Sequence, residues 1–192
     1  KRELDIEKRS EIYDHSLVEI NRLDSLVSNL LLTRSIENKN YFLDKTTLNL
    51  SEFITEKTAL LKSSILKSHE IKLEVNEISF KVDKLAFESV LVNLLENAAK
   101  YSPKSSTIIV QLFQDNLNVY LNVIDEGVGI SKEQRDRVFT KFYREENEMT
   151  RKSKGTGLGL YITKFLIKQH GGLISLKDNA PQGLIVAIQF KK

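Results

Sequence analysis

The chain of 192 residues contains no cysteine, no tryptophan and only 2 prolines. Without cysteine it can form neither a disulfide nor a thiolate metal site, which suits a reducing compartment. It also lacks any apolar run near the roughly 20 residues that a membrane-spanning helix needs. The N-terminal Lys1-Arg2-Glu3 does not have the pattern of a signal peptide. We therefore expect this chain to make no contact with a membrane.

Neither sign of charge dominates the sequence. The 29 Lys and Arg residues are interspersed with 26 Asp and Glu residues, and the formal net charge is +3. Because a nucleic-acid-binding surface concentrates basic residues, we expect no nucleic-acid partner. The apolar fraction of 41% is that of a folded protein. The length allows one packed domain with an appended element.

Glycine and proline are absent from residues 1–38, and this predicts one long N-terminal helix. Its apolar residues recur at intervals of three and four, the spacing of a helix that pairs with others in a bundle or coiled coil. They are Tyr13, Leu17, Ile20, Leu23, Val27 and Leu30. Such a narrow stripe needs a partner helix, so we assign residues 1–40 to a separate element. The alternative is an amphipathic helix that folds onto its own domain.

The remaining residues, 41–192, alternate between helix and strand patterns. Helices are predicted from Ser51, as the helix cap, to Ser68, from Asp83 to Tyr101 and from Leu158 to Gln169. Strands are predicted near Thr47–Leu50, at Ile71–Val75 with Phe80–Val82 as its hairpin partner, and at Thr107–Phe113, Val119–Ile124, Leu173–Leu176 and Leu184–Phe190. The sum predicts an α+β fold, a two-layer sandwich of one mixed sheet with helices on one face.

Polar residues follow one edge of the predicted helix that ends at Tyr101. Asn93, Asn97 and Lys100 lie about one turn apart beside the apolar stripe, with Tyr101 next to them. An amide oxygen at Asn97 can complete the shell of Mg²⁺, which prefers oxygen ligands and retains waters and phosphate oxygens. Taken alone, these residues could equally be the solvent-facing side of an amphipathic helix.

Two glycine-containing turns follow, each at the end of a predicted element. Asp125 ends a strand on the same side as its buried residues, and Gly127 and Gly129 allow a ligand to approach the backbone. The carboxylate there can accept a hydrogen bond from an exocyclic amine such as that of adenine. The second turn opens a helix, whose free N–H groups and dipole suit phosphates. It comprises Gly155, Thr156, Gly157, Leu158, Gly159 and Leu160.

In this order the motifs resemble the catalytic domain of bacterial sensor histidine kinases of two-component systems. Asn93-Leu-Leu-Glu-Asn97-Ala-Ala-Lys100-Tyr101 looks like the N box of that family, and Asp125-Glu-Gly-Val-Gly-Ile130 like its G1 box. Phe139-Thr-Lys-Phe142-Tyr143-Arg144 looks like its F box, and Gly155–Leu160 like its G2 box. The resemblance covers about residues 45–192 and implies the Bergerat ATP-binding fold, which gyrase B, Hsp90 and MutL share.

The resemblance implies a role for individual residues, with ATP and Mg²⁺ as cofactors. Asn97 would be the Mg²⁺ ligand, Asn93 would support the metal or phosphates, and Lys100 would contact phosphate. Asp125 would read adenine and Tyr101 would flank the nucleotide. The further nucleotide contacts would be Gly127, Gly129, Ile130, Arg144, Gly155, Thr156, Gly157, Leu158, Gly159 and Leu160. Residues 131–154 would form a lid over ATP, although the basic residues there could equally be an ordinary solvated face.

The site resembles that of a kinase more closely than that of an ATPase. Relatives that hydrolyse ATP place a glutamate four residues before the metal-binding asparagine, and this chain has Asn93 there, which cannot serve as a general base. The N-terminal helix resembles the second helix of the family's dimerisation and phosphoacceptor hairpin. No box typical of the phosphoacceptor surrounds His15, His69 or His170. His170 is instead expected at a helix end, where a positive charge is favourable.

We therefore expect a histidine kinase domain that donates the γ-phosphoryl of ATP to a histidine upstream of Lys1. A response regulator would then receive the phosphoryl group, and the intact kinase would be a homodimer. The domain would work in the cytoplasm, as part of a membrane-anchored receptor. Two alternatives remain open: a serine kinase of the same fold, of the anti-sigma-factor type, and a non-catalytic scaffold or pseudokinase.

Overall fold

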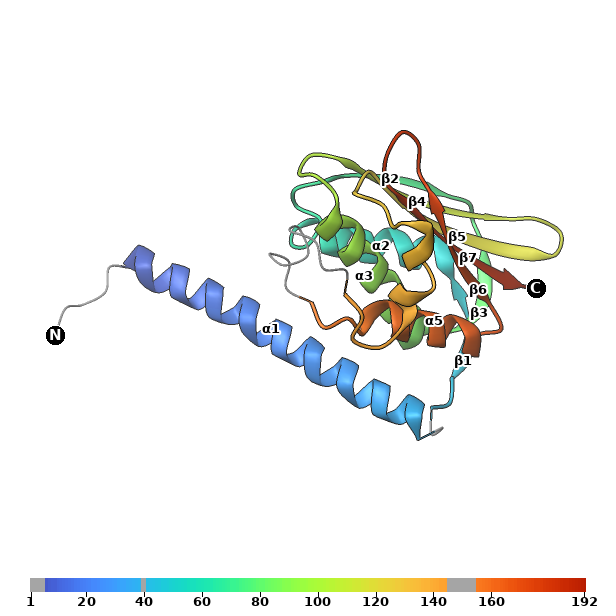
Figure 1. Cartoon of the computed structure of the whole chain (residues 1–192), viewed down its shortest axis with the longest axis horizontal. Coiled ribbons are helices and arrows are strands. Elements are labelled where there is room, and N and C mark those ends of the chain that lie inside the picture. The colour runs from blue at the N-terminus through green and yellow to red at the C-terminus, as the bar shows by residue number, and fades with distance from the viewer. Residues whose placement is uncertain (1–5, 39–40, 145–154) are drawn as a thin grey trace. The chain divides into compact units, whose positions relative to one another are not determined.

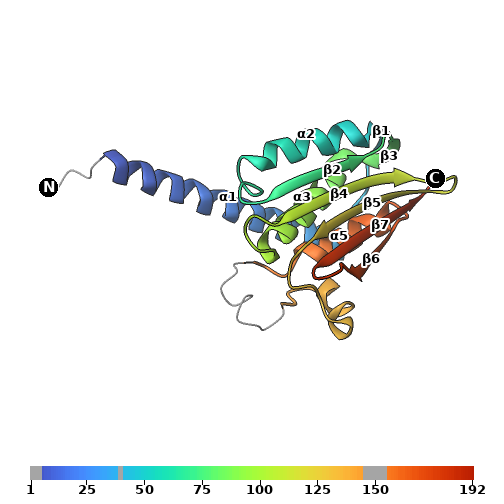
Figure 2. The ribbon, with the colours of Figure 1, turned by 90° about the horizontal axis from the view of Figure 1, so that it is seen from above.

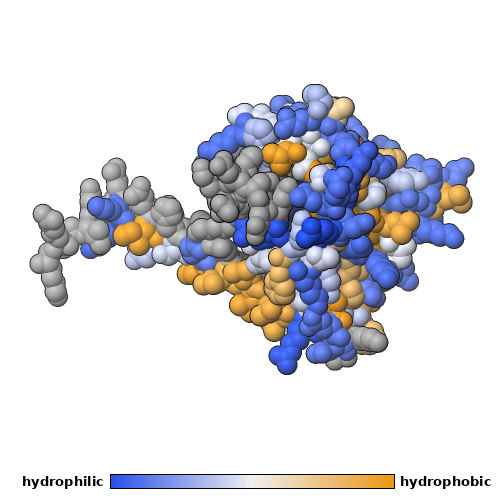
Figure 3. Space-filling view, in the orientation of Figure 1, coloured by the Kyte–Doolittle hydropathy of each residue, from blue (hydrophilic) through white to orange (hydrophobic). Residues whose placement is uncertain are grey.

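The computed structural model describes residues 6–38, 41–144 and 155–192 (Figure 1). It divides into two compact units, Lys1–Tyr41 and Phe42–Lys192. The first unit contains helix α1, Ile6–Glu37. Large apolar side chains are exposed on this helix, and Figure 3 shows apolar side chains gathered along it; they are Ile12, Tyr13, Ile20, Leu23, Val27, Leu30 and Leu31. Among the described helices, none combines the length and apolarity needed to cross a membrane.

The second unit is built on a mixed sheet of five strands, in the order β2-β4-β5-β7-β6. The strands are β2 (Glu70–Val75), β4 (Thr107–Gln114), β5 (Asn118–Asp125), β6 (Leu173–Asp178) and β7 (Leu184–Lys191). Strands β2 and β4 pair in parallel, and the other neighbours are antiparallel. Alternate residues of β4, β5 and β7 are buried, so the sheet has one covered face and one open face.

Helices α3 (Lys84–Tyr101) and α5 (Gly159–Gln169) cover one face of this sheet (Figure 2). The core between them consists of apolar side chains from both layers, among them Phe87, Leu91, Leu94 and Leu95 of α3, Ile162 and Leu166 of α5, and Ile108, Leu112, Leu121 and Ile188 of the sheet. Helix α2 (Leu50–Lys62) joins α3 through Phe53 and Phe87, whose ring centroids lie 5.9 Å apart. The α+β prediction with helices on one face of a mixed sheet is confirmed.

The predicted hairpin between residues 71–75 and 80–82 is wrong. Strand β3 (Ser79–Asp83) pairs antiparallel with β1 (Lys45–Asn49) and forms a separate two-stranded sheet. The backbone N–H of Leu50 donates to the carbonyl of Ile78 at 2.9 Å, and the Ile78 side chain is buried. These contacts draw the chain away from β2. Alternation within a strand therefore predicts the strand but not its neighbour.

The start of α3 is predicted correctly, but both ends of α2 differ from the prediction. Asp83 caps α3 by accepting a hydrogen bond from the Ala86 N–H at 2.9 Å. At α2 the cap is Asn49, which accepts from the Glu52 N–H at 3.2 Å, whereas the predicted cap Ser51 is inside the helix and donates to Asn49. Both residues have good capping side chains, so the choice depends on where β1 ends.

Candidate functional site

Asn93 lies where helices α3 and α5 meet. Its side-chain amide donates to the hydroxyl of Thr163 on α5 at 2.6 Å, and Thr163 is almost fully buried. At the start of α5, Gly159 lies so close that an added Cβ would overlap the Asn93 side chain. An alanine at position 159 would therefore require the Asn93 side chain to move. The contact joins two motifs that are more than 60 residues apart in the sequence.

Asn97 and Lys100 continue the same edge of α3. The Asn97 side-chain amide donates to the Asn93 oxygen at 3.4 Å, the long limit of a hydrogen bond, and both residues are half-buried. The Lys100 Nζ lies 4.8 Å from the centre of the Tyr101 ring. A Cβ added to Gly155 would lie 2.7 Å from the same Nζ. The lysine thus stands between the end of α3 and the glycine-rich turn before α5.

Asp125 is a buried carboxylate at the end of β5. One of its carboxylate oxygens accepts from the backbone N–H of Gly127 at 2.8 Å and of Leu184 at 3.3 Å. Burial raises the pKa of Asp125, and the two backbone hydrogen bonds oppose that shift. The inward direction expected from the alternation of β5 is confirmed, because Val119, Leu121 and Val123 are buried with it.

The turn after Asp125 packs against the end of α3. A Cβ added to Gly127 would lie 2.7 Å from the carbonyl oxygen of Tyr101, so only glycine fits there without a shift. Gly129 has a φ of 72°, which an L side chain rarely adopts. Ile130, at the end of the turn, is half-buried. The turn therefore brings Asp125 and Tyr101, from two separate motifs, to one place.

The glycine-rich turn before α5 also holds the segment that ends at Arg144. The backbone N–H of Phe142 donates to the carbonyl of Gly157 at 3.0 Å. Gly157 has a φ of 70°, and an added Cβ would lie 2.7 Å from the Phe142 backbone. Arg144 is exposed and lies just beyond this contact. Arg151, Lys152 and Lys154 lie outside the described residues.

The side chains of the glycine-rich turn have different surroundings. The Thr156 hydroxyl accepts from the Leu158 N–H at 3.2 Å, which stabilises the turn. Leu158 is buried in the core, and Leu160 is half-buried. What this turn can offer a phosphate is therefore mainly backbone N–H groups at the start of α5, an 11-residue helix.

Three contributors to the site are not singled out by the sequence. Thr163 holds Asn93, the Leu184 N–H bonds the Asp125 side chain, and the Asn179 side chain donates to the Asp125 carbonyl at 2.9 Å. Asn179 and Leu184 border the turn between β6 and β7, which the sequence indicates only as a turn. Thr163 lies one helical turn after Gly159, a spacing that gives no signal until α3 is in place.

The two histidines whose side chains the structure describes, His69 and His170, are buried and half-buried. His69 is buried at the start of β2. His170 caps α5; its Nδ1 lies 2.7 Å from the Leu166 carbonyl, and its Nε2 accepts from the Asp83 N–H at 3.1 Å. Burial lowers the pKa of His170, so the positive charge expected there is disfavoured. His15 lies on α1, and its side chain is outside the described residues.

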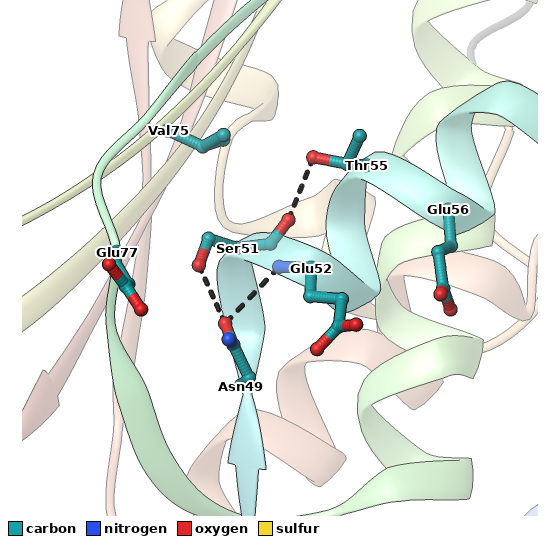
Figure 4. A pocket seen from close by; sticks show the side chains of 7 residues that line it. All are labelled: Asn49, Ser51, Glu52, Thr55, Glu56, Val75 and Glu77. Atoms are coloured by element: carbon teal, nitrogen blue, oxygen red, sulfur yellow. Dashed lines mark hydrogen bonds between the residues drawn. The ribbon is translucent and has the colours of Figure 1, made fainter.

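A separate hollow of about 370 Å³ opens beside the start of α2 (Figure 4). It is lined by Asn49, Ser51, Glu52, Thr55, Glu56, Val75 and Glu77. Val75 pairs with Leu112, and Leu112 pairs with Leu121 of β5. Because Asp125 is four residues farther along β5, the hollow lies toward the opposite end of the sheet, about 13 Å along the strand direction. The motif residues do not line it.

A metal ion in the site would need ligands from a bound nucleotide. Within the described ranges, no three carboxylate or imidazole groups come together as a metal cage. A single amide oxygen such as that of Asn97 suits Mg²⁺, which takes the rest of its shell from phosphates and water. The half-exposed polar edge of α3 beside the start of α5 fits that requirement.

Comparison with known proteins agrees with this geometry. Residues 82–192 match the family described as histidine kinase-, DNA gyrase B-, and HSP90-like ATPase. The chain is 30% identical over 191 residues to the sensor protein KdpD of Clostridium acetobutylicum, covering 98% of this chain and 21% of that protein. Across the first curated relatives it matches, the chain spans between 21% and 39% of their length.

Solved structures show the same fold. The mycobacterial sensor histidine kinase MprB is 28% identical, with a TM-score of 0.68 over 77% of this chain and 97% of that chain. Full-length ShkA in complex with AMPPNP aligns with a TM-score of 0.78 over 98% of this chain and 40% of that chain, and at 22% identity the likeness is one of fold. The chain thus belongs to the histidine kinase-, DNA gyrase B- and HSP90-like ATPase family, as the ATP-binding catalytic domain of a sensor histidine kinase.

Proposed function

We propose that the domain binds Mg-ATP between the edge of α3, the start of α5 and the end of β5. The observation that carries this proposal is the contact of Asn93 with both Gly159 and Thr163, since it joins the amide-bearing helix to a helix start with free N–H groups. Asn97 would be the Mg²⁺ ligand and Lys100 a phosphate contact. Bound Mg²⁺ would supply charge neutralisation at the phosphates.

The adenine base would lie against the turn after β5. The buried Asp125 carboxylate offers an acceptor for the exocyclic amine, and its raised pKa is consistent with a site shielded from water. Gly127 and Gly129 let this turn pack closely against the end of α3 and against Gly183, with Tyr101 and Ile130 at the sides of the turn. The segment 131–144, with Arg144, would be the described part of the lid.

The domain would hold ATP for transfer and hydrolyse it slowly. Asn93 stands where ATPase relatives have a general base, and its amide is occupied as a donor to Thr163. An amide has no proton-accepting role at neutral pH. Glu96 is exposed and next to Asn97 rather than one turn before it. Catalysis would then rest on positioning and charge around the phosphates until an acceptor arrives.

The phosphoryl acceptor would be a histidine outside these 192 residues. Of the described histidines, His69 is buried, and both ring nitrogens of His170 are engaged. Helix α1, with its exposed apolar residues, would be the second helix of a dimerisation hairpin in a homodimeric kinase (Figure 3). An aspartate of a response regulator would receive the phosphoryl group, in the cytoplasm, where ATP is available.

Two measurements on the purified chain test this function. Calorimetric titration with ADP, with and without Mg²⁺, should show Mg²⁺-dependent binding in the wild type and its loss in Asn97→Ala. Incubation with labelled ATP should leave no acid-labile phosphate on the chain. Absence of nucleotide binding by the wild type would favour a scaffold, acid-stable phosphoserine would favour a serine kinase, and acid-labile phosphate on His15, His69 or His170 would refute the external acceptor.

A further inference from the structure

The Arg135 side chain bonds three acceptors that lie on two separate segments. Its Nε donates to the carbonyl of Ile130 at 3.3 Å, and one terminal nitrogen donates to the carbonyl of Leu176 at 3.3 Å. The other terminal nitrogen pairs with the Asp178 carboxylate. The arginine side chain is 21% exposed. Nothing in the sequence distinguishes Arg135 from the other basic residues of segment 131–154.

The two segments that carry these acceptors meet beside Asp125. Ile130 ends the turn that begins at Asp125, whereas Leu176 and Asp178 belong to β6. The turn after β6 supplies two of the contacts to Asp125, the side chain of Asn179 and the N–H of Leu184. A Cβ on Gly129 would lie 3.2 Å from the Gly183 carbonyl, so the two turns already touch. Arg135 thus joins both ends of the structure that supports the buried carboxylate.

We propose that Arg135 is a positioning residue for recognition of the nucleotide base. Its guanidinium fixes the Asp125–Ile130 turn against the hairpin of β6 and β7, and this sets the direction of the Asp125 carboxylate. The inference rests on the proposed role of Asp125 in reading adenine. Arg135 itself need not touch the nucleotide.

The chemistry of the guanidinium explains why arginine is needed there. A planar group with donors in a fixed fork can serve three acceptors that lie in different directions, whereas a lysine ammonium is a compact charge on a flexible stem. The Asp178 side chain is 66% exposed, so the ion pair alone contributes little. The orientation of the guanidinium therefore depends mainly on its hydrogen bonds to the carbonyls of Ile130 and Leu176. Arg135→Lys therefore keeps the positive charge but removes the planar set of donors that bonds the three acceptors.

Affinity for three ligands separates base recognition from phosphate binding. Mg-ADP, Mg-GDP and Mg-tripolyphosphate would be titrated calorimetrically into wild type and Arg135→Lys. We expect the preference for ADP over GDP to fall about tenfold in the variant, since misplacement by a fraction of an ångström costs that much. Affinity for tripolyphosphate should change by less than about twofold. Equal losses for ADP and tripolyphosphate, or an unchanged preference, would overturn the inference.

Two further variants distinguish a failure of the proposed role of Asp125 from a failure of the proposed role of Arg135. If Asp125→Asn leaves the ADP preference intact, Asp125 does not read the base, and the proposed function is wrong at that point. If Asp125→Asn removes the preference and Arg135→Lys does not, only the inference about Arg135 is refuted. Lys177→Gln removes an exposed charge from the same strand, between Leu176 and Asp178, and should leave all three affinities unchanged.

Hydrogen exchange distinguishes a local effect of Arg135→Lys from a general loss of structure in the variant. In Arg135→Lys the amides of Gly127 and Leu184, which bond Asp125, should exchange faster, while amides within α3 keep their protection. A uniform loss of protection across α3 and the sheet would mean a general structural role and would refute positioning. The same measurement on Lys177→Gln supplies the baseline.

Discussion

The proposed base-facing and phosphate-facing sides of the site are built differently. On the base side, Asp125 is 6% exposed, and its carboxylate is held by two backbone N–H groups. On the phosphate side, Asn93 and Asn97 are half-buried side chains on a helix edge, joined to each other at 3.4 Å. One side is therefore set by backbone groups beside the end of β5 and the start of β7, and the other by side chains between two helices.

This difference indicates how each half can respond to a ligand. A carboxylate held by backbone donors has little freedom, so the proposed base side would be organised before a nucleotide arrives. Asn93 is fixed by its short bond to Thr163, but Asn97 has only the long bond to Asn93. Asn97 can turn toward a metal at small cost. The proposed base side would thus favour selectivity, and the proposed phosphate side would adapt to the charge of its ligand.

The largest expected effect is at Asn97. Asn97→Ala removes the one side-chain oxygen that we assign to Mg²⁺, and we expect affinity for Mg-ADP to fall by about 100-fold. The loss should shrink when the same titration is made in EDTA, because the metal then no longer contributes. If the ratio between wild type and variant is the same with and without Mg²⁺, Asn97 is not a metal ligand.

A second variant tests whether Asp125 favours nucleotide binding while it lowers the free energy of unfolding. Burial raises the pKa of Asp125, so the folded state binds a proton more tightly than the unfolded state. That contribution stabilises the fold at low pH and is lost as pH rises through the folded-state pKa. At neutral pH the ionised carboxylate thus lowers the free energy of unfolding.

Asp125→Asn should accordingly keep or raise thermal stability at pH 7 while weakening ADP binding by about 10- to 100-fold. The asparagine oxygen can still accept from Gly127 and Leu184. Differential scanning calorimetry and ADP titration would be compared on one sample. A clear fall in thermal stability together with unchanged ADP affinity would show that the carboxylate is structural.

Two glycines at opposite ends of α5 provide a matched pair. Gly159→Ala would place a Cβ on the Asn93 side chain, and we expect about tenfold weaker binding of ADP and tripolyphosphate alike. Gly171 has a φ of 77° with nothing within 4 Å of an added Cβ, so Gly171→Ala should cost about 1 kcal/mol of stability and leave both affinities unchanged. If Gly159→Ala and Gly171→Ala bind ADP and tripolyphosphate with equal affinity, Gly159 does not contribute to the binding site.

The smallest expected effect concerns the contact of His170 with Asp83, the cap of α3. Burial lowers the pKa of His170, and its Nε2 must be unprotonated to accept from Asp83, the cap of α3. Its contribution to stability is present above the ordinary pKa of 6.5 and is lost as pH falls through the lower folded-state pKa. Urea unfolding at pH 7.5 and 5.5 should show less loss on acidification in His170→Gln than in wild type.

Much of the site can be predicted from local sequence, but its internal contacts cannot. The cap at Asp83, the inward direction of Asp125 and the helix start near Gly159 each follow from periodicity or turn chemistry over a few residues. The pairing of β3 with β1 and the cap at Asn49 differ from prediction, because each depends on a segment that is distant or competes locally. Arg135 carries no local signal, since its three acceptors come from two segments.

The sequence by itself therefore determined the family, the order of the motifs and the residue types of the proposed nucleotide site. Spacing within a helix or strand settles which residues share a face, and the steric demands of tight turns settle where glycine stands. The tertiary structure alone decided that Thr163 holds Asn93, that the β6–β7 turn supports Asp125 and that Arg135 joins two segments. Those contacts depend on the packing of elements far apart in the chain, which no local pattern encodes.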